Sequence, residues 1–362
     1  MLAPVSPADR PTPAAPQTGL RGRALAVVGG MLCRDLRELT DDLSVLDGEG
    51  FWAVVLPYEG RPLCARFADV RPASPWSGAP WPGVDTASWR STLAEPAFRS
   101  GVETIRERIR AGAVYQVNLT RRLRAPIDLD VPGTDVAALG AALAEGNPAP
   151  FSAVVRIPEA GVAIASASPE LFLRRDGHVV RSSPIKGTAA RPDAFLVKDR
   201  AENVMIVDLV RNDLGRVCRY GSVTVPGLCV PEEHPGLVHL VSTVEGRLAP
   251  GAGWPELVAA TFPPGSVTGA PKIAACEVIR ELEADSRGPY CGAIGWVDAD
   301  RGMGELNVAI RTFWMADDHL WFGTGGGITI DSTPEGEWAE TELKADRLLR
   351  VASAPALEVG WV

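Results

Sequence analysis

Hydrophobic and polar positions repeat along this chain with two different periods, and together they predict a mixture of helices and strands. Apolar residues from Phe98 to Ile109 recur at helical spacing, and Gly112 follows them as a stop signal. Residues 115–120 then alternate between apolar and polar side chains, which is typical of a strand. The pattern therefore predicts a helix followed directly by a strand.

The same reading along the rest of the chain predicts many strands and four further helices. Strands are expected at 24–28, 51–55, 152–157, 161–167, 170–174, 178–182, 222–226, 293–298, 307–315 and 319–330, and helices at about 135–146, 199–214, 271–284 and 335–351. Ser332 to Glu335 resembles a capping box for the last helix. Short connections favour antiparallel pairing, and strands and helices do not strictly alternate, so the class is α+β.

Three segments differ in composition. Residues 1–23 are rich in proline and alanine, which cannot sustain a helix or a central strand, and we expect a disordered tail. Residues 24–95 predict a short, irregular sheet-like region that packs on the remainder. Residues 96–362 then form the main body of the protein.

Composition narrows the class of function. The chain has 362 residues, is 46% hydrophobic and carries a net charge of −9. It can bury a large core, and it lacks the basic runs that a nucleic-acid partner requires. The six cysteines include no Cys-x-x-Cys pair, and no stretch approaches the length of a membrane helix. We expect a cytoplasmic enzyme.

Lys186 is the candidate nucleophile. It lies between Pro184 and Gly187, just after a predicted strand, so it could occupy a half-buried turn. A lysine becomes nucleophilic when burial or nearby cations lower its pKa and leave a free amine near neutral pH. A solvated turn lysine is the alternative reading.

Paired carboxylates lie on two of the predicted helices. Glu202 has Asp199 one turn before it, and Glu340 lies three residues after Glu337 and four before Lys344. Oxygen ligands of this kind suit Mg²⁺. A surface salt bridge between Glu340 and Lys344 explains the spacing equally well, so both interpretations remain open.

Two further features indicate anion recognition. Arg311 alternates with apolar neighbours in the predicted strand 307–315, where a rigid guanidinium fork suits a carboxylate. Gly325, Gly326 and Gly327 remove side chains from a strand, which allows a ligand to approach the backbone. A dinucleotide fingerprint is excluded because Ile328 occupies the place of its last glycine.

The order of these blocks resembles the chorismate-utilising enzymes, which include anthranilate synthase component I, aminodeoxychorismate synthase component I, and isochorismate and salicylate synthases. The resemblance covers about residues 96–352 and is carried by Tyr115–Leu119, Ser168–Glu170, Ser183–Thr188, Ala201–Leu214, Phe262–Lys272, Ile310–Thr312 and Gly325–Ile328. The Pro-Ile-Lys-Gly-Thr form around Lys186 looks like the aminodeoxychorismate synthases, whereas anthranilate synthases usually have alanine there.

The resemblance implies a four-layer αββα sandwich with large, mainly antiparallel sheets and chorismate bound between them. It implies that Glu202 and Glu340 hold Mg²⁺, with Asp199 and Glu337 as outer supports. It assigns Glu170 as the acid, and it places His239 near the departing hydroxyl group. The implied substrate contacts are Tyr290, Arg311, Thr268, Gly269, Lys272, Lys344 and the glycines 325–327.

The implied reaction is the amination of chorismate to 4-amino-4-deoxychorismate through a Lys186 adduct, for para-aminobenzoate and folate synthesis. Because the chain has no Cys-His glutaminase motif, ammonia would come from a glutamine amidotransferase subunit. Anthranilate synthase component I, an isochorismate or salicylate synthase, and a catalytically silent regulatory relative are the alternatives.

Overall fold

The computed structural model describes residues 20, 22–189, 191, 195, 197–234 and 237–354. The predicted tail lies outside these residues, apart from residues 20, 22 and 23. No helix in the described part is both long enough and apolar enough to cross a membrane.

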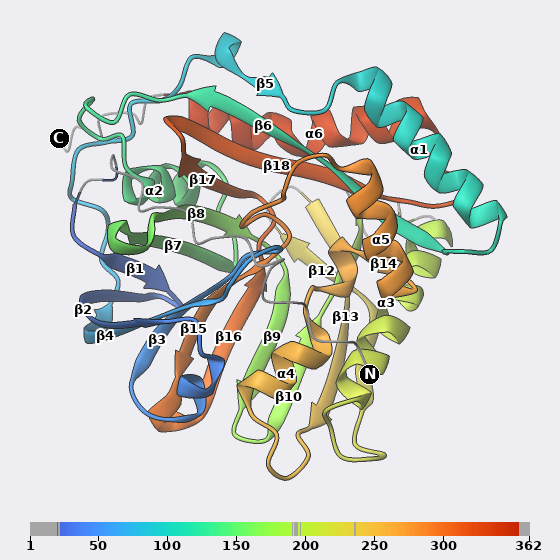
Figure 1. Ribbon diagram of the computed structural model, residues 1–362, viewed down its shortest axis with the longest axis horizontal. Helices are drawn as coiled ribbons and strands as arrows, with labels where there is room; N and C mark the ends of the chain where they lie inside the picture. The colour runs from blue at the N-terminus through green and yellow to red at the C-terminus, as the bar shows by residue number, and fades with distance from the viewer. Residues whose placement is uncertain are drawn as a thin grey trace, which may run out of the picture.

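Strands dominate the fold (Figure 1). They are β1 (Leu25–Val28), β2 (Met31–Thr40), β3 (Phe51–Leu56), β4 (Leu63–Pro72), β5 (Arg90–Ser91), β6 (Gln116–Pro126), β7 (Phe151–Ile157), β8 (Val162–Ser168), β9 (Leu171–Asp176), β10 (Val179–Ser183), β11 (Ile185–Ala189), β12 (Thr224–His234), β13 (Leu237–Arg247), β14 (Gly269–Ala270), β15 (Ala293–Asp298), β16 (Met303–Val308), β17 (Thr312–Ala316) and β18 (His319–Ile328).

Six α-helices accompany the described strands. They are α1 (Glu95–Arg110), α2 (Val136–Gly146), α3 (Val197–Gly215), α4 (Trp254–Thr261), α5 (Lys272–Leu282) and α6 (Pro334–Ser353). Short 3-10 turns are η2 (Leu43–Asp47), η3 (Thr86–Ser88), η4 (Pro158–Ala160), η6 (Gly265–Val267) and η7 (Ala299–Arg301).

The described strands form one continuous ribbon of antiparallel pairings. From β6 the ribbon runs through β18, β17, β8 and β7 to β1. It continues through β2, β4, β3 and β15, then through β16, β9 and β10 to β13, which also pairs with β11 and β12. The predicted antiparallel α+β fold is confirmed.

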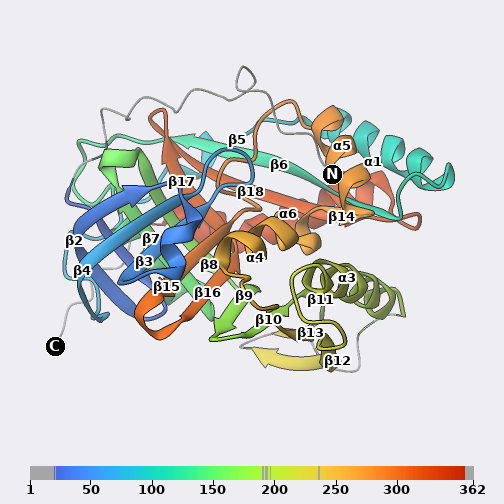
Figure 2. The ribbon, with the colours of Figure 1, turned by 60° about the horizontal axis from the view of Figure 1, so that its bottom comes forward.

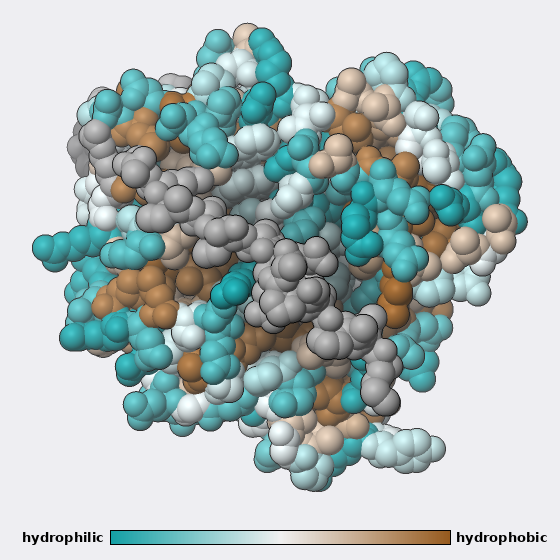
Figure 3. Space-filling view, viewed as in Figure 1, coloured by the Kyte–Doolittle hydropathy of each residue, from teal (hydrophilic) through white to brown (hydrophobic). Residues whose placement is uncertain are grey.

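Helices lie outside the two halves of this ribbon. Helices α2 and α6 pack on β7, β8 and β18, and α1 packs on α6, whereas α3 packs on β11 and β13 (Figures 1 and 2). Residues 24–95 are part of the same sheet, because β1 pairs with β7 and β3 pairs with β15. The surface mixes polar residues with small apolar clusters, one of them over α5 (Figure 3).

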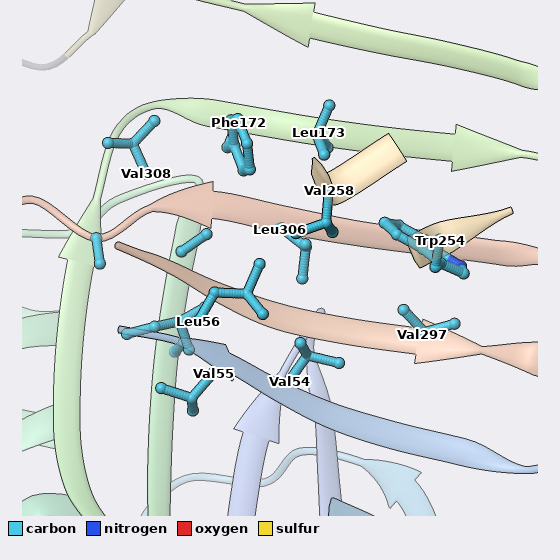
Figure 4. Packing of buried hydrophobic residues seen from close by; sticks show 14 of the residues in the cluster. Val54, Val55, Leu56, Phe172, Leu173, Trp254, Val258, Val297, Leu306 and Val308 are labelled. Atoms are coloured by element: carbon cyan, nitrogen blue, oxygen red, sulfur yellow. The ribbon is translucent and has the colours of Figure 1, made fainter. Parts of the chain in front are cut away.

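The main core lies where α4 packs against the sheet formed by β3, β15, β16 and β9. Trp254 of α4 and Leu306 of β16 are fully buried there, and Leu173 and Val54 point into the same layer (Figure 4). Burying a side chain of this size contributes roughly 1.5–3 kcal/mol. This packed layer therefore fixes the positions of β9 and β16, and with them the residues that lie at the ends of these two strands.

Two predicted elements are wrong in ways that affect the site. The single strand expected at 307–315 is two strands, since β16 ends at Val308 and β17 begins at Thr312, and Arg311 lies between them with a φ of 52°. Lys186 lies on the strand β11 instead of in a turn, and Gly187 has a φ of 87° at a shift in the β11–β13 register. A run of apolar residues does not reveal such interruptions of a strand, because it indicates that the segment is buried and not which backbone conformation each residue adopts.

Helix α6 begins as expected, but its cap differs. Thr333 is the N-cap residue, and its hydroxyl accepts the backbone N–H of Gly336 at 3.2 Å. Ser332 donates instead to Glu337 at 2.5 Å. The capping box predicted from Ser332 and Glu335 is therefore replaced by a cap one residue later.

Candidate active site

The Lys186 amine is surrounded by carboxylates and by one other lysine. Burial is the main reason that its pKa falls below the usual 10.5, and the Lys344 cation lowers it further. Glu202, Glu170 and Glu340 act in the opposite direction and raise it. The structure thus brings Lys186 together with the proposed acid and both proposed metal ligands, although they lie on four different segments.

Glu170 is the buried acid of this group. It follows β8 in the link to β9 and is only 4% exposed, so burial raises the pKa of its carboxyl group. Hydrogen bonds from the Ser266 hydroxyl and the Ile185 backbone N–H, together with the charges of Lys186 and Arg311, lower it. The Ile185 contact ties the acid to the strand that carries Lys186.

The glycines of β18 allow side chains to approach from both faces of the strand. A β-carbon at Gly326 would lie 2.9 Å from Glu337 Oε2 and 3.8 Å from Glu340 Oε1. A β-carbon at Gly327 would collide with the Gln116 amide nitrogen and lie 3.4 Å from Lys186 Nζ. The predicted close approach to this backbone is therefore made by the chain's own side chains.

The carboxylates of α6 and α3 share one electrostatic neighbourhood. Burial raises the pKa of Glu337, and the charges of Glu340 and Glu202 raise it further, against a hydrogen bond from Ser332 and the charge of Lys344. The salt bridge between Lys344 Nζ and Glu340 Oε1, 2.7 Å long and half-exposed, is also present. The salt-bridge interpretation of the α6 spacing is therefore confirmed, and the metal-ligand interpretation stays a prediction.

Lys344 and Asp199 support this neighbourhood from two sides. Lys344 donates to the carbonyl oxygen of Gly325 at 3.0 Å, so its charge is held at the glycine strand. Asp199 lies against the strand of Lys186, with its β-carbon 3.0 Å from the point that a β-carbon of Gly187 would occupy.

Arg311 and Tyr290 approach the site from different directions. Burial lowers the pKa of Arg311 most, and the charge of Arg347 lowers it further. The charge of Glu170 raises this pKa, so Arg311 lies near Glu170. Its position is a turn between strands, which corrects the predicted strand position. Tyr290 is 4% exposed, and its ring lies against Gly323 of β18. Burial, then Cys291, raises the pKa of its hydroxyl.

His239 lies on β13 and pairs with Thr188 of the neighbouring strand β11. Thr188 is two residues after Lys186 on β11. Its side chain is buried, with 3% exposed. The structure therefore brings it near the nucleophile's strand.

The loop 268–272 corrects one prediction. The Lys272 ammonium donates to Asp213 at 2.5 Å and to the Thr261 carbonyl oxygen at 2.7 Å, so its charge is neutralised inside the protein instead of facing a substrate. The Thr268 hydroxyl likewise donates to the Pro264 carbonyl oxygen at 3.1 Å. Gly269, with a φ of 146°, lets this loop pass beside the Gln116 backbone.

Sequence reasoning missed two residues of the site. Ser266 supports Glu170, and no local pattern distinguishes it from other loop serines. Gln116 is 2% exposed, and its Oε1 has no hydrogen-bond partner among the described residues. The Gln116 amide nitrogen and the Lys186 amine both lie beside Gly327 of β18, a proximity that only the fold reveals.

No group of three or more His, Cys, Asp or Glu side chains among the described residues is arranged to hold a metal ion. Glu202 and Glu340 remain a pair of candidate oxygen ligands. Such a pair would require oxygen atoms from another source, such as a bound substrate or water, to complete the shell of a hard cation.

Comparison with known proteins shows the family of the chain. Residues 80–350 match the family described as chorismate binding enzymes. The chain is 42% identical to anthranilate synthase component 1 1 of Haloarcula marismortui over 74% of this chain and 55% of that protein. It is 40% identical to aminodeoxychorismate synthase component 1 of Escherichia coli over 73% and 59%, and 37% identical to that of Klebsiella aerogenes over 82% and 68%.

The chain therefore spans a little over half the length of the first two of these relatives. Among solved structures, a 2,3-dihydroxybenzoate-specific isochorismate synthase from Bacillus anthracis superimposes with a TM-score of 0.74 at 24% identity, over 91% of this chain and 96% of that one. The likeness to that structure establishes the fold. On the family match and these relatives, the chain belongs to the chorismate binding enzymes.

Proposed function

We propose that this enzyme is an aminodeoxychorismate synthase component 1, which converts chorismate and ammonia to 4-amino-4-deoxychorismate and water. The observation that carries the proposal is the Lys186 amine, whose pKa is lowered by burial, beside the buried acid Glu170. The relatives from Escherichia coli and Klebsiella aerogenes support the same reaction.

The reaction needs an acid because hydroxide leaves a carbon atom poorly. Glu170 is suited to this role, since burial raises its pKa and favours the protonated form near neutral pH. In the proposed first step the Lys186 nitrogen forms a bond to C2, the ring double bonds shift, and the C4–O bond breaks. Glu170 gives its proton to the departing oxygen, which leaves as water.

Ammonia then completes the reaction. Its lone pair forms a bond to C4, the double bonds shift back, and the electron pair of the C2–N bond returns to Lys186 as a free amine. The new C4 ammonium group passes one proton to the Glu170 carboxylate. Both residues thereby regain their starting states, and the sum is chorismate plus ammonia giving the amino product plus water.

The carboxylates fit a Mg²⁺ site. Glu337 feels the like charges of Glu340 and Glu202, a repulsion that a divalent cation would relieve, and the available donors are all oxygen atoms. We propose Glu202 and Glu340 as ligands and Glu337 and Asp199 as supports. When bound, Mg²⁺ would anchor the ring carboxylate and withdraw charge from the ring.

Anthranilate synthesis is the second candidate, because the relative from Haloarcula marismortui carries that name at similar identity. It would release pyruvate and give an aromatic amine, without a covalent lysine adduct. Lys186 favours amination without elimination. Ammonia would come from a partner glutamine amidotransferase, as the component 1 name of the relatives suggests.

Mass spectrometry of the product tests the proposal. The purified chain should convert chorismate with Mg²⁺ and an ammonium salt to the amino product, and glutamine should not replace ammonium. Lys186→Ala should lower turnover by roughly 10²-fold or more while chorismate still binds. The control is Arg301→Ala, which removes a 78% exposed side chain. Anthranilate or isochorismate as product, or an unchanged rate for Lys186→Ala, contradicts it.

A further inference from the structure

Arg287 is a fully buried arginine outside the group of charges described above. It is 1% exposed, and its guanidinium donates to two backbone carbonyl oxygens, those of Val267 and Asn118, each at 2.8 Å. Two further N–H groups reach Glu283, each at 2.7 Å, and the ring of Tyr58 lies 4.6 Å below it.

The two carbonyl oxygens belong to two adjacent segments that border the site, and the Asn118 N–H also donates to the Thr268 carbonyl oxygen at 2.7 Å. Val267 directly follows Ser266, whose hydroxyl donates to the acid Glu170. Asn118 lies on β6 two residues after Gln116, whose amide nitrogen lies against Gly327 beside Lys186. One planar group therefore connects the turn that holds the acid with the strand that lines the nucleophile.

Glu283 strengthens the same connection. Its Oε1 also accepts the backbone N–H of Thr120 at 2.8 Å, so β6 is held through both a carbonyl and an amide group. A buried ion pair is seldom a net source of stability compared with apolar packing, whereas a rigid fork fixes the relative position of its partners. The arrangement thus favours a role for Arg287 in fixing the relative positions of the segments that it contacts.

We propose that Arg287 is a positioning residue, which sets the separation of Glu170 and Lys186 by joining the Ser266–Val267 turn to β6. The proposal rests on the assignment of Glu170 and Lys186 as reacting groups. A displacement of about 1 Å between reacting groups can lower the rate about 100-fold. Loss of this clamp, the set of hydrogen bonds from Arg287 to Val267, Asn118 and Glu283, should therefore lower kcat.

Arg287→Lys keeps the charge but cannot span two carbonyl oxygens. We expect kcat to fall roughly 10- to 100-fold, while KM for chorismate changes less than about threefold and circular dichroism shows a folded protein. Glu283→Gln keeps one hydrogen bond and should show a smaller loss of the same kind. Arg121→Lys, at another buried arginine, which contacts Thr341 and the Trp338 ring, is the matched control and should leave kcat within about twofold.

A double-mutant cycle separates positioning from general damage. If Arg287 acts through the Ser266 turn, Ser266→Ala combined with Arg287→Lys should lose about as much kcat as the worse single variant. Losses that multiply, or Arg287→Lys with lower stability and normal kcat, would overturn the proposal. Because chorismate consumption is measured, an unexpected product contradicts the proposed function and not the clamp.

A chain that does not turn over chorismate still permits a test. The labelling rate of Lys186 by an amine-selective reagent, followed by mass spectrometry of the peptide, should change at least about threefold in Arg287→Lys and stay unchanged in Arg121→Lys. Equal labelling in all three proteins would show that Arg287 does not position this wall of the site.

Discussion

At the scale of single residues, one physical cause acts on both of the proposed reacting groups. Burial disfavours charge, so it lowers the pKa of Lys186 and raises that of Glu170. Each group moves toward its neutral form, which is the form that the proposed chemistry needs. The attraction between their charges opposes this trend. Glu170 raises the pKa of Lys186, and Lys186 lowers the pKa of Glu170.

The activity should show a bell-shaped dependence on pH. Activity rises as Lys186 loses its proton and falls as Glu170 loses its own, and burial moves both limbs toward neutrality. The check is kcat/KM for chorismate between roughly pH 5 and 11.5, with free ammonia held constant. A rising limb with its midpoint at the ordinary lysine value of 10.5 would contradict the assignment of Lys186.

At the scale of elements, the site depends on a bare strand beside a charged helix. The glycines of β18 admit Glu337, Glu340 and Lys344 from α6, and Gln116 and Lys186 from β6 and β11. A β-sheet normally gains stability from its side chains, so three consecutive glycines weaken β18 as a strand. The absence of side chains leaves the room in which these groups approach the strand.

Gly326→Ala should weaken Mg²⁺-dependent binding of chorismate. The new β-carbon would lie 2.9 Å from Glu337 Oε2, so the carboxylates of α6 must move away from the strand. We expect about a tenfold loss of affinity by calorimetric titration. Gly215→Ala is the control, since its β-carbon would meet no atom within 4 Å at the end of α3. Equal affinities for both variants would contradict the role of the bare strand.

Thr333→Ala should lower the stability of the protein through α6. It removes the side chain that accepts the Gly336 N–H, and a lost N-cap costs about 1 kcal/mol of unfolding free energy. Denaturant unfolding measures the change. Thr104→Ala in α1, whose hydroxyl donates only to Ser100 within the same helix, should change the unfolding free energy by less than about 0.5 kcal/mol.

At the scale of the whole molecule, the site forms where the two ends of the ribbon of strands meet. β18 and β6 belong to one end, and β11 with its helix α3 belongs to the other. The proposed ligands Glu202 and Glu340 come from these opposite ends. A cation between them would therefore hold the two halves of the fold together.

Mg²⁺ with chorismate should raise the thermal midpoint of the protein. A ligand that binds only the folded chain at 100 times its Kd adds about 2.7 kcal/mol. Chelation by EDTA should remove the shift together with most of the activity. In Glu202→Gln the shift should be strongly reduced, whereas Gly215→Ala should retain it. A shift that survives both EDTA and Glu202→Gln would place the cation elsewhere.

Most elements of the fold follow from local pattern. The helices α1, α2, α3, α5 and α6 and the strands β7 to β10, β15 and β18 were predictable, because a buried stripe or alternation repeats over several residues. Among the strands longer than two residues, β2, β4, β11 and β13 were not predicted, and helix α4 was not predicted either. β11 and α4 are short and contain glycine or proline, whereas β13 has eleven residues whose apolar positions do not alternate regularly.

The chain's motifs, taken in order, identified the family, and the resemblance supplied Lys186, Glu170, Glu202 and Glu340 as candidate site residues. Distances and burial needed the folded ribbon. Only packing between remote segments lowers the pKa of Lys186, turns Lys272 toward Asp213 and places Arg287 between the Val267 turn and β6. Electric fields and hydrogen bonds act through space, and sequence order does not record which segments meet.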